Sequence, residues 1–382
     1  MNRLLSILIT IIAAVLLAYI PVNLASTKNL FQRGQPIYNR ILNHAQTTTA
    51  RATPFLGLPL FPSARLASTA TTTSSNMTTA TPRAIKFSFL AREQAEGAGA
   101  RVRRSIGTPK LRNFTPFLML DHFSIAPTAG FPDHPHRGQE TITYLLKGGV
   151  DHEDFAGNKG TIWPGDLQFM TAGRGIMHAE MPVQGEELIA GLQLWVDLPE
   201  NLKGCEPRYR DLRGSEIPVA TTDDGKVTVK VISGRSLGVD SLKDLAYTPV
   251  WILDMTIQPG GSITQEIPLG WNAFVYTLEG VASFTNGTQK PAQAVPPYHN
   301  VVFEQEGDVM DVSVEDGASE AARIILIAGQ PLNQEVVQYG PFVTTSREKV
   351  YEALMDFQTA SNGFERARNW ESTIGKRLGH VS

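Results

Sequence analysis

From about Ile85 onward the chain consists of short apolar runs separated by Gly, Pro and Asp, and this pattern constrains the fold more than any other feature. Runs rich in Val, Ile, Phe, Trp and Thr are typical of half-buried strands. The runs are Phe117–Leu120, Thr141–Leu146, Asp166–Met170, Leu192–Asp197, Val227–Ile232, Val250–Ile257, Ala273–Leu278, Val301–Phe303 and Arg323–Ala328. A doubly wound α/β fold would need long amphipathic helices between them, and the sequence does not show such patterns. We therefore predict an all-β fold built as a sandwich or as barrels.

The predicted strands come in two sets that resemble each other. YLLKG at 144–148 matches YTLEG at 276–280, and PGD at 164–166 matches EGD at 306–308. The interval between the two motifs is longer in the second set, where the extra residues fall in the Pro-rich stretch KPAQAVPPYHN. Two matches in the same order indicate a duplicated barrel.

One amphipathic helix is predicted near the C-terminal end. Thr345 and Glu348 have the spacing of a capping box, and apolar residues follow at helical spacing between 350 and 357. Asn362 and Gly363 predict where the helix stops. We expect it to pack on one barrel or to bridge the two.

The first eighty residues differ in composition from the rest. Residues 4–22, LLSILITIIAAVLLAYIPV, carry no charge and have about the length that crosses a bilayer. The acid-free, Arg- and Ser-rich stretch that follows is typical of a mitochondrial presequence, and its low-complexity part predicts disorder. Three alternatives stay open: a single-pass membrane anchor, a mitochondrial presequence, or a true start at Met77. Residues 1–83 are thus expected to form an extension outside the barrels.

Bulk composition narrows the classes of partner and site. The net charge of −3 gives no electrostatic basis for binding nucleic acid or an anionic membrane. The single cysteine, Cys205, excludes an intramolecular disulfide and any multi-cysteine zinc or iron–sulfur site. Histidines and carboxylates remain as candidate metal ligands.

Two motifs place such side chains one residue apart. His134 and His136 flank a proline in DHPHRGQE, and His178 and Glu180 stand in GRGIMHAE about forty residues later. Side chains at i and i+2 of a strand point to the same face, so each pair can offer two ligands to one ion. Three imidazoles and one carboxylate suit Fe(II), Mn, Ni or Cu better than a structural zinc ion. On a six-coordinate ion this set leaves two positions for water, O₂ or a chelating substrate.

The second set of strands lacks these ligands. Aligning the two tyrosines of the repeat puts Glu266 at the place of His134 and Pro268 at the place of His136. The asymmetry predicts that the first half carries the site and the second half supports it.

The segments FPDHPHRGQETITYLL and GDLQFMTAGRGIMHAEMP resemble the pirin family, the two-barrel members of the cupin superfamily. Similar segments extend from VRRSIG near residue 103 to NGFERARNW at 362–370, so the resemblance covers roughly residues 84–376. It implies two tandem cupin (jelly-roll) β-barrels with a C-terminal helix. The N-terminal barrel, over 84–205, would carry the metal site, and the C-terminal barrel, over 206–376, would lack metal ligands.

The resemblance also implies a ligand set. In pirins the motif H-x-H…H-x-E holds a single iron, which makes His134, His136, His178 and Glu180 the expected ligands of Fe(II). Glu140 stands at the glutamate position of the general cupin motif, but the resemblance places it around the ligands rather than among them.

Other polar residues near these motifs have alternative interpretations. His122 is either a residue that orients the site through a hydrogen bond or a buried structural histidine. His152 is expected in a solvated loop. Arg137 is expected to pair with Glu140 or Asp133, or to lie free on the surface.

Two functions follow from the resemblance. Pirins resemble flavonol 2,3-dioxygenases, which predicts that a flavonol such as quercetin chelates the metal, that Glu180 takes the proton of its 3-hydroxyl, and that O₂ cleaves the ring. The alternative is an iron-dependent, redox-sensing transcriptional co-regulator that acts through protein partners and not by contacting nucleic acid. A metal-stabilised scaffold without chemistry is a third possibility. The pirin part is expected to be a cytoplasmic or nuclear monomer, whereas residues 1–83 suggest a membrane or mitochondrial address.

Overall fold

The structure is a computed structural model that describes residues 80–382, apart from 98, 186–187, 243–244, 289 and 381–382. The predicted anchor at 4–22, the presequence and the alternative start at Met77 lie outside the described residues. Within the described part, no helix combines the length and the apolar character needed to cross a membrane. That part is mostly β-strand, which confirms the predicted all-β class.

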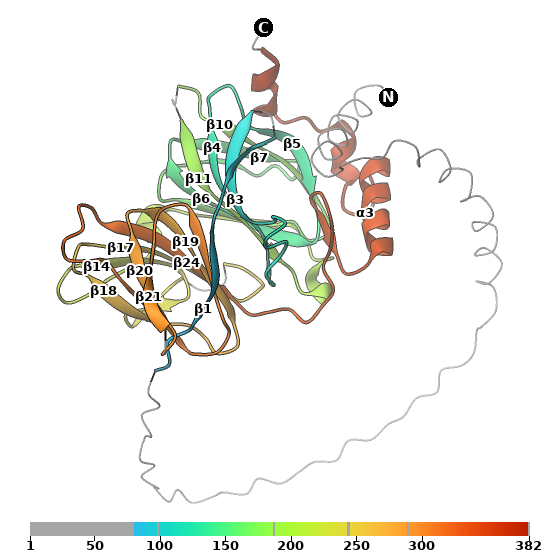
Figure 1. The fold of residues 1–382 in the computed structure, drawn as a ribbon. Coiled ribbons are helices and arrows are strands. Elements are labelled where there is room, and N and C mark those ends of the chain that lie inside the picture. Colours follow the sequence, from blue (N-terminus) through green and yellow to red (C-terminus); the bar gives the residue numbers. More distant parts are fainter. Residues whose placement is uncertain (1–79, 98, 186–187, 243–244, 289, 381–382) are drawn as a thin grey trace, which may run out of the picture. The chain divides into compact units, whose positions relative to one another are not determined.

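The first barrel consists of two antiparallel sheets. Its larger sheet has the strand order β12-β9-β6-β11-β4-β3-β2, and its smaller sheet has the order β5-β10-β7-β8. The larger sheet contains β2 (Glu93–Glu96), β3 (Ala100–Ile106), β4 (Phe117–Ile125), β6 (Gln139–Lys147), β9 (Leu167–Thr171), β11 (Ile189–Asp197) and β12 (Arg208–Leu212). The smaller sheet contains β5 (Phe131–His136), β7 (Val150–Asp154), β8 (Lys159–Ile162) and β10 (Ile176–Pro182). The chain alternates between the two sheets, so strands distant in sequence become neighbours (Figure 1).

The second barrel repeats this design. Its larger sheet contains β1 (Ile85–Leu90), β13 (Val219–Thr221), β14 (Val227–Ser233), β17 (Val250–Ile257), β19 (Asn272–Glu279), β22 (His299–Phe303) and β24 (Ala322–Gly329). Its smaller sheet contains β18 (Ser262–Glu266), β20 (Ala282–Asn286), β21 (Lys290–Val295) and β23 (Val309–Ser313). Buried apolar side chains fill this barrel, among them Val229, Leu253, Val275, Phe284 and Val312.

Equivalent strands occupy equivalent places in the two barrels, which confirms the predicted duplication. β6 lies between β9 and β11 as β19 lies between β22 and β24, and β11 then pairs with β4 as β24 pairs with β17. Glu266, which the sequence alignment sets at the place of His134, is exposed, whereas Ile263 and Gln265 of β18 are buried. The connection after β18, residues 267–271, is longer than the connection after β5, residues 137–138, so an alignment on the two tyrosines does not keep these strands in register.

Strand pairing departs from the predicted division at 205/206 in two places. β1 precedes the first barrel in sequence, yet it pairs with β22 of the second barrel, from Ile85 opposite Phe303 to Leu90 opposite His299. β12 follows the predicted boundary, yet it pairs with β9 of the first barrel. Each barrel therefore takes one strand from the other side of the predicted boundary.

The larger sheets of the two barrels share a hydrophobic core. Its members include Phe117, Ile142 and Leu194 from the first barrel and Ile252, Phe274 and Ile325 from the second. The equivalent tyrosines of the repeat reach across it: Tyr144 donates a hydrogen bond to Asp254 at 2.7 Å, and the Tyr276 hydroxyl lies 3.3 Å from His122 Nδ1. His122 is therefore a structural residue of the barrel interface, which agrees with the second of the two alternatives predicted for it and not with a role in orienting the metal site.

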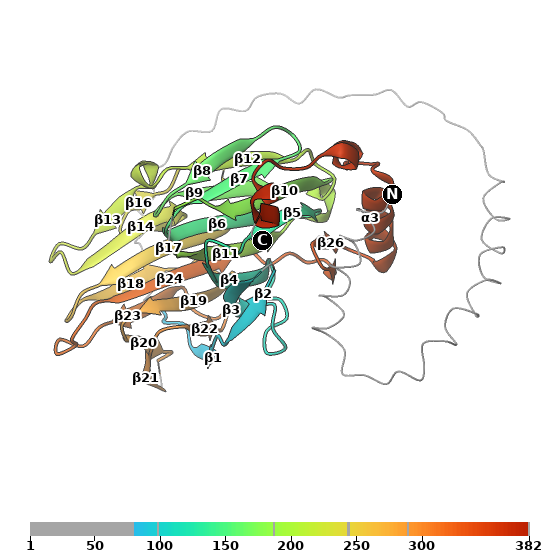
Figure 2. The same cartoon turned by 90° about the horizontal axis from the view of Figure 1, so that it is seen from above.

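The predicted C-terminal helix is α3 (Arg347–Thr359), and it packs on the hairpin of β25 (Val337–Tyr339) and β26 (Phe342–Thr344) (Figure 2). Its N-cap is Ser346, whose hydroxyl accepts from Lys349 N, so the predicted cap at Thr345 was wrong by one residue. The helix ends at Ala360, which has a left-handed φ of 53°, two residues before the predicted stop. Buried Ala353 of α3, Phe342 of β26 and Met177 of β10 belong to one hydrophobic cluster. The helix and its hairpin therefore pack against the strand that carries His178.

Candidate metal centre

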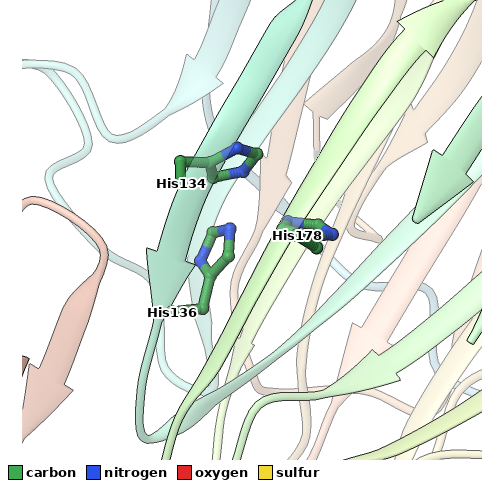
Figure 3. Close-up of side chains that lie close together, drawn as sticks. All are labelled: His134, His136 and His178. Atoms are coloured by element: carbon green, nitrogen blue, oxygen red, sulfur yellow. The ribbon is translucent and has the colours of Figure 1, made fainter. Parts of the chain in front are cut away.

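The two histidine motifs lie on neighbouring strands of the smaller sheet in the first barrel. β5 carries His134 and His136, β10 carries His178, and the antiparallel pairing sets His178 directly opposite His134. Strand geometry turns both β5 histidines to the same face, because one residue separates them. Figure 3 shows the three rings pointing toward one another, and their candidate ligand atoms all lie within 4.8 Å of one another. The structure thus brings together the three predicted imidazole ligands.

The hydrogen bonds of these rings are made through their Nδ1 atoms. Each Nδ1 atom has a partner in the protein, and the partners are the Pro132 carbonyl at 2.8 Å from His134, the Gln139 amide at 2.9 Å from His136 and the Tyr209 hydroxyl at 3.4 Å from His178. The Nε2 atoms of His136 and His178 are buried and lack a hydrogen-bond partner within the described part of the chain. A buried lone pair without a donor is costly unless a ligand uses it. The residues present therefore fit a metal ion bound through Nε2 atoms.

Electrostatics keep these imidazoles in the form that binds metals. Burial lowers the pKa of His136 and of His178 well below the ordinary histidine range, and the neighbouring His134 lowers both further. The two rings are therefore neutral near pH 7, and only a neutral imidazole has a lone pair to give to a cation.

Glu180, the fourth predicted ligand, is buried on the same strand as His178 but is held by the opposite sheet. Thr143 Oγ1 donates to its Oε1 at 3.1 Å, and Gln193 Nε2 donates to its Oε2 at 3.3 Å. The register of β10 against β5 shifts between His178 and Glu180, which turns the strand at this point. The group of converging ligand atoms comprises the histidines alone, so metal binding by Glu180 stays a prediction.

Comparison with known proteins identifies the family. The family model named Pirin matches residues 99–196, and the model of the pirin C-terminal cupin domain matches residues 252–363. The chain belongs to the pirin family. Pirin from Homo sapiens is 50% identical over 292 residues, which cover 76% of this chain and 98% of the human protein. A pirin-like protein from Solanum lycopersicum is 48% identical over 291 residues, covering 76% of this chain and 97% of the tomato protein.

A solved structure supports the fold of this chain. A quercetin 2,3-dioxygenase from Acinetobacter baumannii matches with a TM-score of 0.66 at 28% identity, over 73% of this chain and 98% of the bacterial chain. The agreement extends over both barrels and confirms the cupin fold.

Glu140, the glutamate of the general cupin motif, has a structural environment in this pirin. Its buried carboxylate accepts from Thr171 Oγ1 at 2.7 Å and from the backbone N–H groups of Tyr247 at 3.0 Å and Thr248 at 3.3 Å. Burial raises the pKa of Glu140 against these hydrogen bonds. The carboxylate therefore ties the segment before β17 to the first barrel.

Two predictions about neighbouring residues were wrong. His152 is buried and not solvated, because β7 turns it inward, and its Nε2 lies 3.0 Å from Asp211 Oδ2. Arg137 pairs with Asp356 at 2.8 Å, rather than with either of the acidic residues nearby in sequence. Both partners come from segments distant in the sequence, which the local pattern does not reveal.

Polar residues of the larger sheet face the triad across the barrel interior, and the sequence motifs did not predict them. They are Thr141, Thr143, Gln168, Gln193 and Trp195, which alternate with core residues on β6, β9 and β11. Gln168 Nε2 and Trp195 Nε1 are buried and have no hydrogen-bond partner among the described residues. Trp195 packs edge-on against His136, with ring centroids 5.1 Å apart. Alternation in TITY and LQLW was the available signal that one face of these strands is polar.

A surface depression lies away from the triad, lined mainly by residues of the first barrel. It has a volume of about 790 Å³ and is lined by Trp163, Asp166, Arg213 and Lys230, with none of the triad residues. Two of its charged side chains pair with each other, since Arg213 lies 2.8 Å from Asp166. The convergent histidines, and not this depression, are therefore the candidate functional site.

Proposed function

We propose that the protein is a mononuclear metal-dependent oxidoreductase of the flavonol 2,3-dioxygenase type, with Fe(II) as its metal. The observation that carries the proposal is the set of three imidazoles that converge inside one barrel, two of them with buried Nε2 atoms that lack a partner among the described residues. The equivalent barrel has an apolar interior, so barrel stability alone does not require such a site. The likeness to a quercetin 2,3-dioxygenase supports the reaction class.

The proposed ligands are His134, His136 and His178, with Glu180 as the fourth. An Fe(II) ion bound there would supply Lewis-acid and redox chemistry between a chelating flavonol and O₂. Mn, Ni or Cu would suit the same donors. The proposal of a small-molecule substrate is supported by this metal site and by the polar residues of the larger sheet that face it.

Glu180 is also the proposed general base, which takes the proton of the substrate's 3-hydroxyl. Gln193 Nε2 donates to one carboxylate oxygen, and the Thr143 hydroxyl lies 3.1 Å from the other and 2.6 Å from Gln193 Oε1, between which its one proton is shared. Each carboxylate oxygen keeps a further lone pair. These two residues therefore fix the orientation of the base without saturating it. Trp195 Nε1 and Gln168 Nε2 are the donors left to bind oxygen atoms of the substrate.

Oxygen uptake with quercetin tests the proposal. Protein loaded in turn with Fe(II), Mn, Ni and Cu is expected to consume O₂ with at least one metal, as quercetin absorbance falls. Glu180→Gln should lower kcat by roughly 100-fold or more, the usual contribution of a general base. Glu266→Gln changes an exposed glutamate of the second barrel and serves as the matched control. No O₂ consumption with any of the four metals, or equal rates for Glu180→Gln and wild type, would refute the proposal.

The co-regulator hypothesis stays a prediction. It requires that a protein partner binds the reduced and the oxidised metal states with different free energies. Partner binding that is equal in the reduced, oxidised and metal-free forms would exclude it.

A further inference from the structure

Gln139 contacts a metal ligand from the first position of β6. Its amide nitrogen Nε2 lies 2.9 Å from Nδ1 of His136, and both side chains are buried, with 0% and 1% of their surface exposed. The other amide atom, Oε1, is also buried and has no hydrogen-bond partner within the described residues. Because both side chains are buried, the amide and the imidazole are hydrogen-bond partners of each other rather than of bulk water.

The chemistry of the pair links the amide orientation to the imidazole tautomer. A neutral imidazole carries its proton on one nitrogen and a lone pair on the other. With the amide –NH₂ toward Nδ1, the proton of His136 belongs on Nε2, which then has no lone pair to give. With the amide oxygen toward Nδ1, that nitrogen donates its proton and Nε2 becomes a metal ligand. The same side chain can make either bond by a half-turn of its amide.

Hydrogen bonds hold the turn between His136 and Gln139 in place, so the two side chains keep their separation. Gly138 N donates to Gly173 O at 2.8 Å, and the Gly138 carbonyl accepts from Lys203 Nζ at 2.8 Å. Arg137 is fixed by its ion pair with Asp356. A rigid turn places an outer partner more reproducibly than a free loop would.

We infer that Gln139 is a positioning residue for His136: its amide oxygen accepts from Nδ1–H and thereby presents Nε2 to the metal. The inference rests on the metal site of the proposed function but not on the flavonol reaction. Partners of this kind, one shell beyond the metal, typically change metal affinity by about 10–100-fold. The second barrel offers a matched glutamine, because Gln265 is likewise buried and faces its barrel interior, but it contacts backbone carbonyls.

Metal affinity of the variants tests the inference. Affinities of the full-length protein for Zn²⁺, a diamagnetic stand-in, are measured by competition with a chromophoric chelator. Gln139→Leu is expected to bind about 10–100-fold more weakly than wild type. Gln139→Glu, whose carboxylate can only accept, should bind at least as tightly as wild type, and Gln265→Leu should equal wild type. In nitrogen-15 spectra of the zinc-loaded wild type, the proton of His136 should be on Nδ1, with a shift that moves in Gln139→Glu.

The outcomes separate this inference from the proposed function. If wild type binds no metal, the metal site and this inference both fail. If wild type binds and Gln139→Leu binds equally well, only the inference fails. A loss in Gln139→Glu as large as in Gln139→Leu would indicate a packing role and would also overturn it. Should Gln139→Leu not fold, Gln139→Glu decides, since an affinity at least tenfold below wild type contradicts an accepting role.

Discussion

Each histidine of the triad is held at Nδ1 by a different kind of group. Pro132 offers a carbonyl that only accepts, whereas Tyr209 and Gln139 can each donate or accept. Because the Pro132 carbonyl can only accept, Nδ1 of His134 must donate its proton to it. The lone pair of the ring is then on Nε2, where a metal can bind. The tautomers of the other two depend on side chains, so single substitutions around them will change the site more than substitutions around His134.

Gly138, in the turn after His136, is a position where only glycine fits. Its φ is +78°, and an added Cβ would meet the Val343 carbonyl oxygen at 2.0 Å. Gly225 has a similar φ of +70° but has nothing within 4 Å of an added Cβ, so it serves as the control. We expect Gly225→Ala to lower the free energy of unfolding by about 1 kcal/mol through backbone strain alone. Gly138→Ala should lose roughly 2 kcal/mol more, because the turn must move.

Urea denaturation of the two alanine variants measures these losses, and chelator competition measures the accompanying change in metal affinity. Gly138→Ala should weaken metal binding, whereas Gly225→Ala should not. Equal losses of stability in both variants would mean that the Val343 carbonyl gives way freely.

At the scale of elements, the C-terminal segment fastens the sheet that carries the ligands. Ser372 hydrogen-bonds Asp133, next to His134, and Thr373 N donates to Glu153 at 2.8 Å. Ile374 packs on Ala179 and Met181, which flank Glu180 on β10. Figures 1 and 2 both show this segment beside β5 and β10. We call residues 371–377 the C-terminal strap.

Removing the strap should loosen the metal site without unfolding the barrels. A chain that ends at residue 370 is expected to release its metal to excess chelator roughly tenfold faster than the full chain, because β5 and β10 lose their outer support. Its thermal midpoint should also be lower. A chain that ends at residue 377 keeps the strap and should match the full chain. Identical release rates for the two truncated chains would show that the strap does not support the site.

Sequence patterns predicted the larger sheets far better than the smaller ones. All nine predicted runs overlap strands of the two larger sheets, since strands such as β17 are long and rich in branched apolar residues. β5 and β10, the ligand strands, read FPDHPH and IMHAEMP, which contain prolines and lack an apolar alternation. Their motifs predicted the histidines, but Tyr209 comes from β12 and could not be placed without the tertiary fold.

At the scale of the whole molecule, duplication produced two barrels with the same strand order and different interiors. The first barrel has polar residues and histidines inside, and the second has aliphatic and aromatic residues. At the interface between the barrels, the two equivalent tyrosines also have different partners. Tyr144 hydrogen-bonds to Asp254, which forms an ion pair with Arg323, whereas the hydroxyl of Tyr276 contacts the imidazole of His122. Of the two residues that these tyrosines contact across the interface, one is therefore an imidazole, His122, and the other is a carboxylate, Asp254.

That imidazole should make the stability of the protein depend on pH. Burial, together with the nearby charges of Arg103 and Arg323, lowers the pKa of His122 to about 4. The unfolded chain has a histidine pKa of about 6.5, so it binds the proton more readily than the folded chain. The contribution of neutral His122 is thus complete above about pH 6.5 and is lost as the pH falls toward 4, with a limit of about 3 kcal/mol.

Comparison with His122→Gln isolates this effect, because the glutamine keeps a partner for Tyr276 and does not titrate. Both proteins carry the same triad histidines, so the titration of the metal site cancels in the difference. Free energies of unfolding measured at pH 7 and pH 4.5 should fall by about 2 kcal/mol more in wild type than in the variant. The Asp254–Arg323 pair on the equivalent position is present in both proteins and cancels too. Parallel pH profiles for wild type and variant would mean that the interface admits water and that His122 titrates there as it does in the unfolded chain.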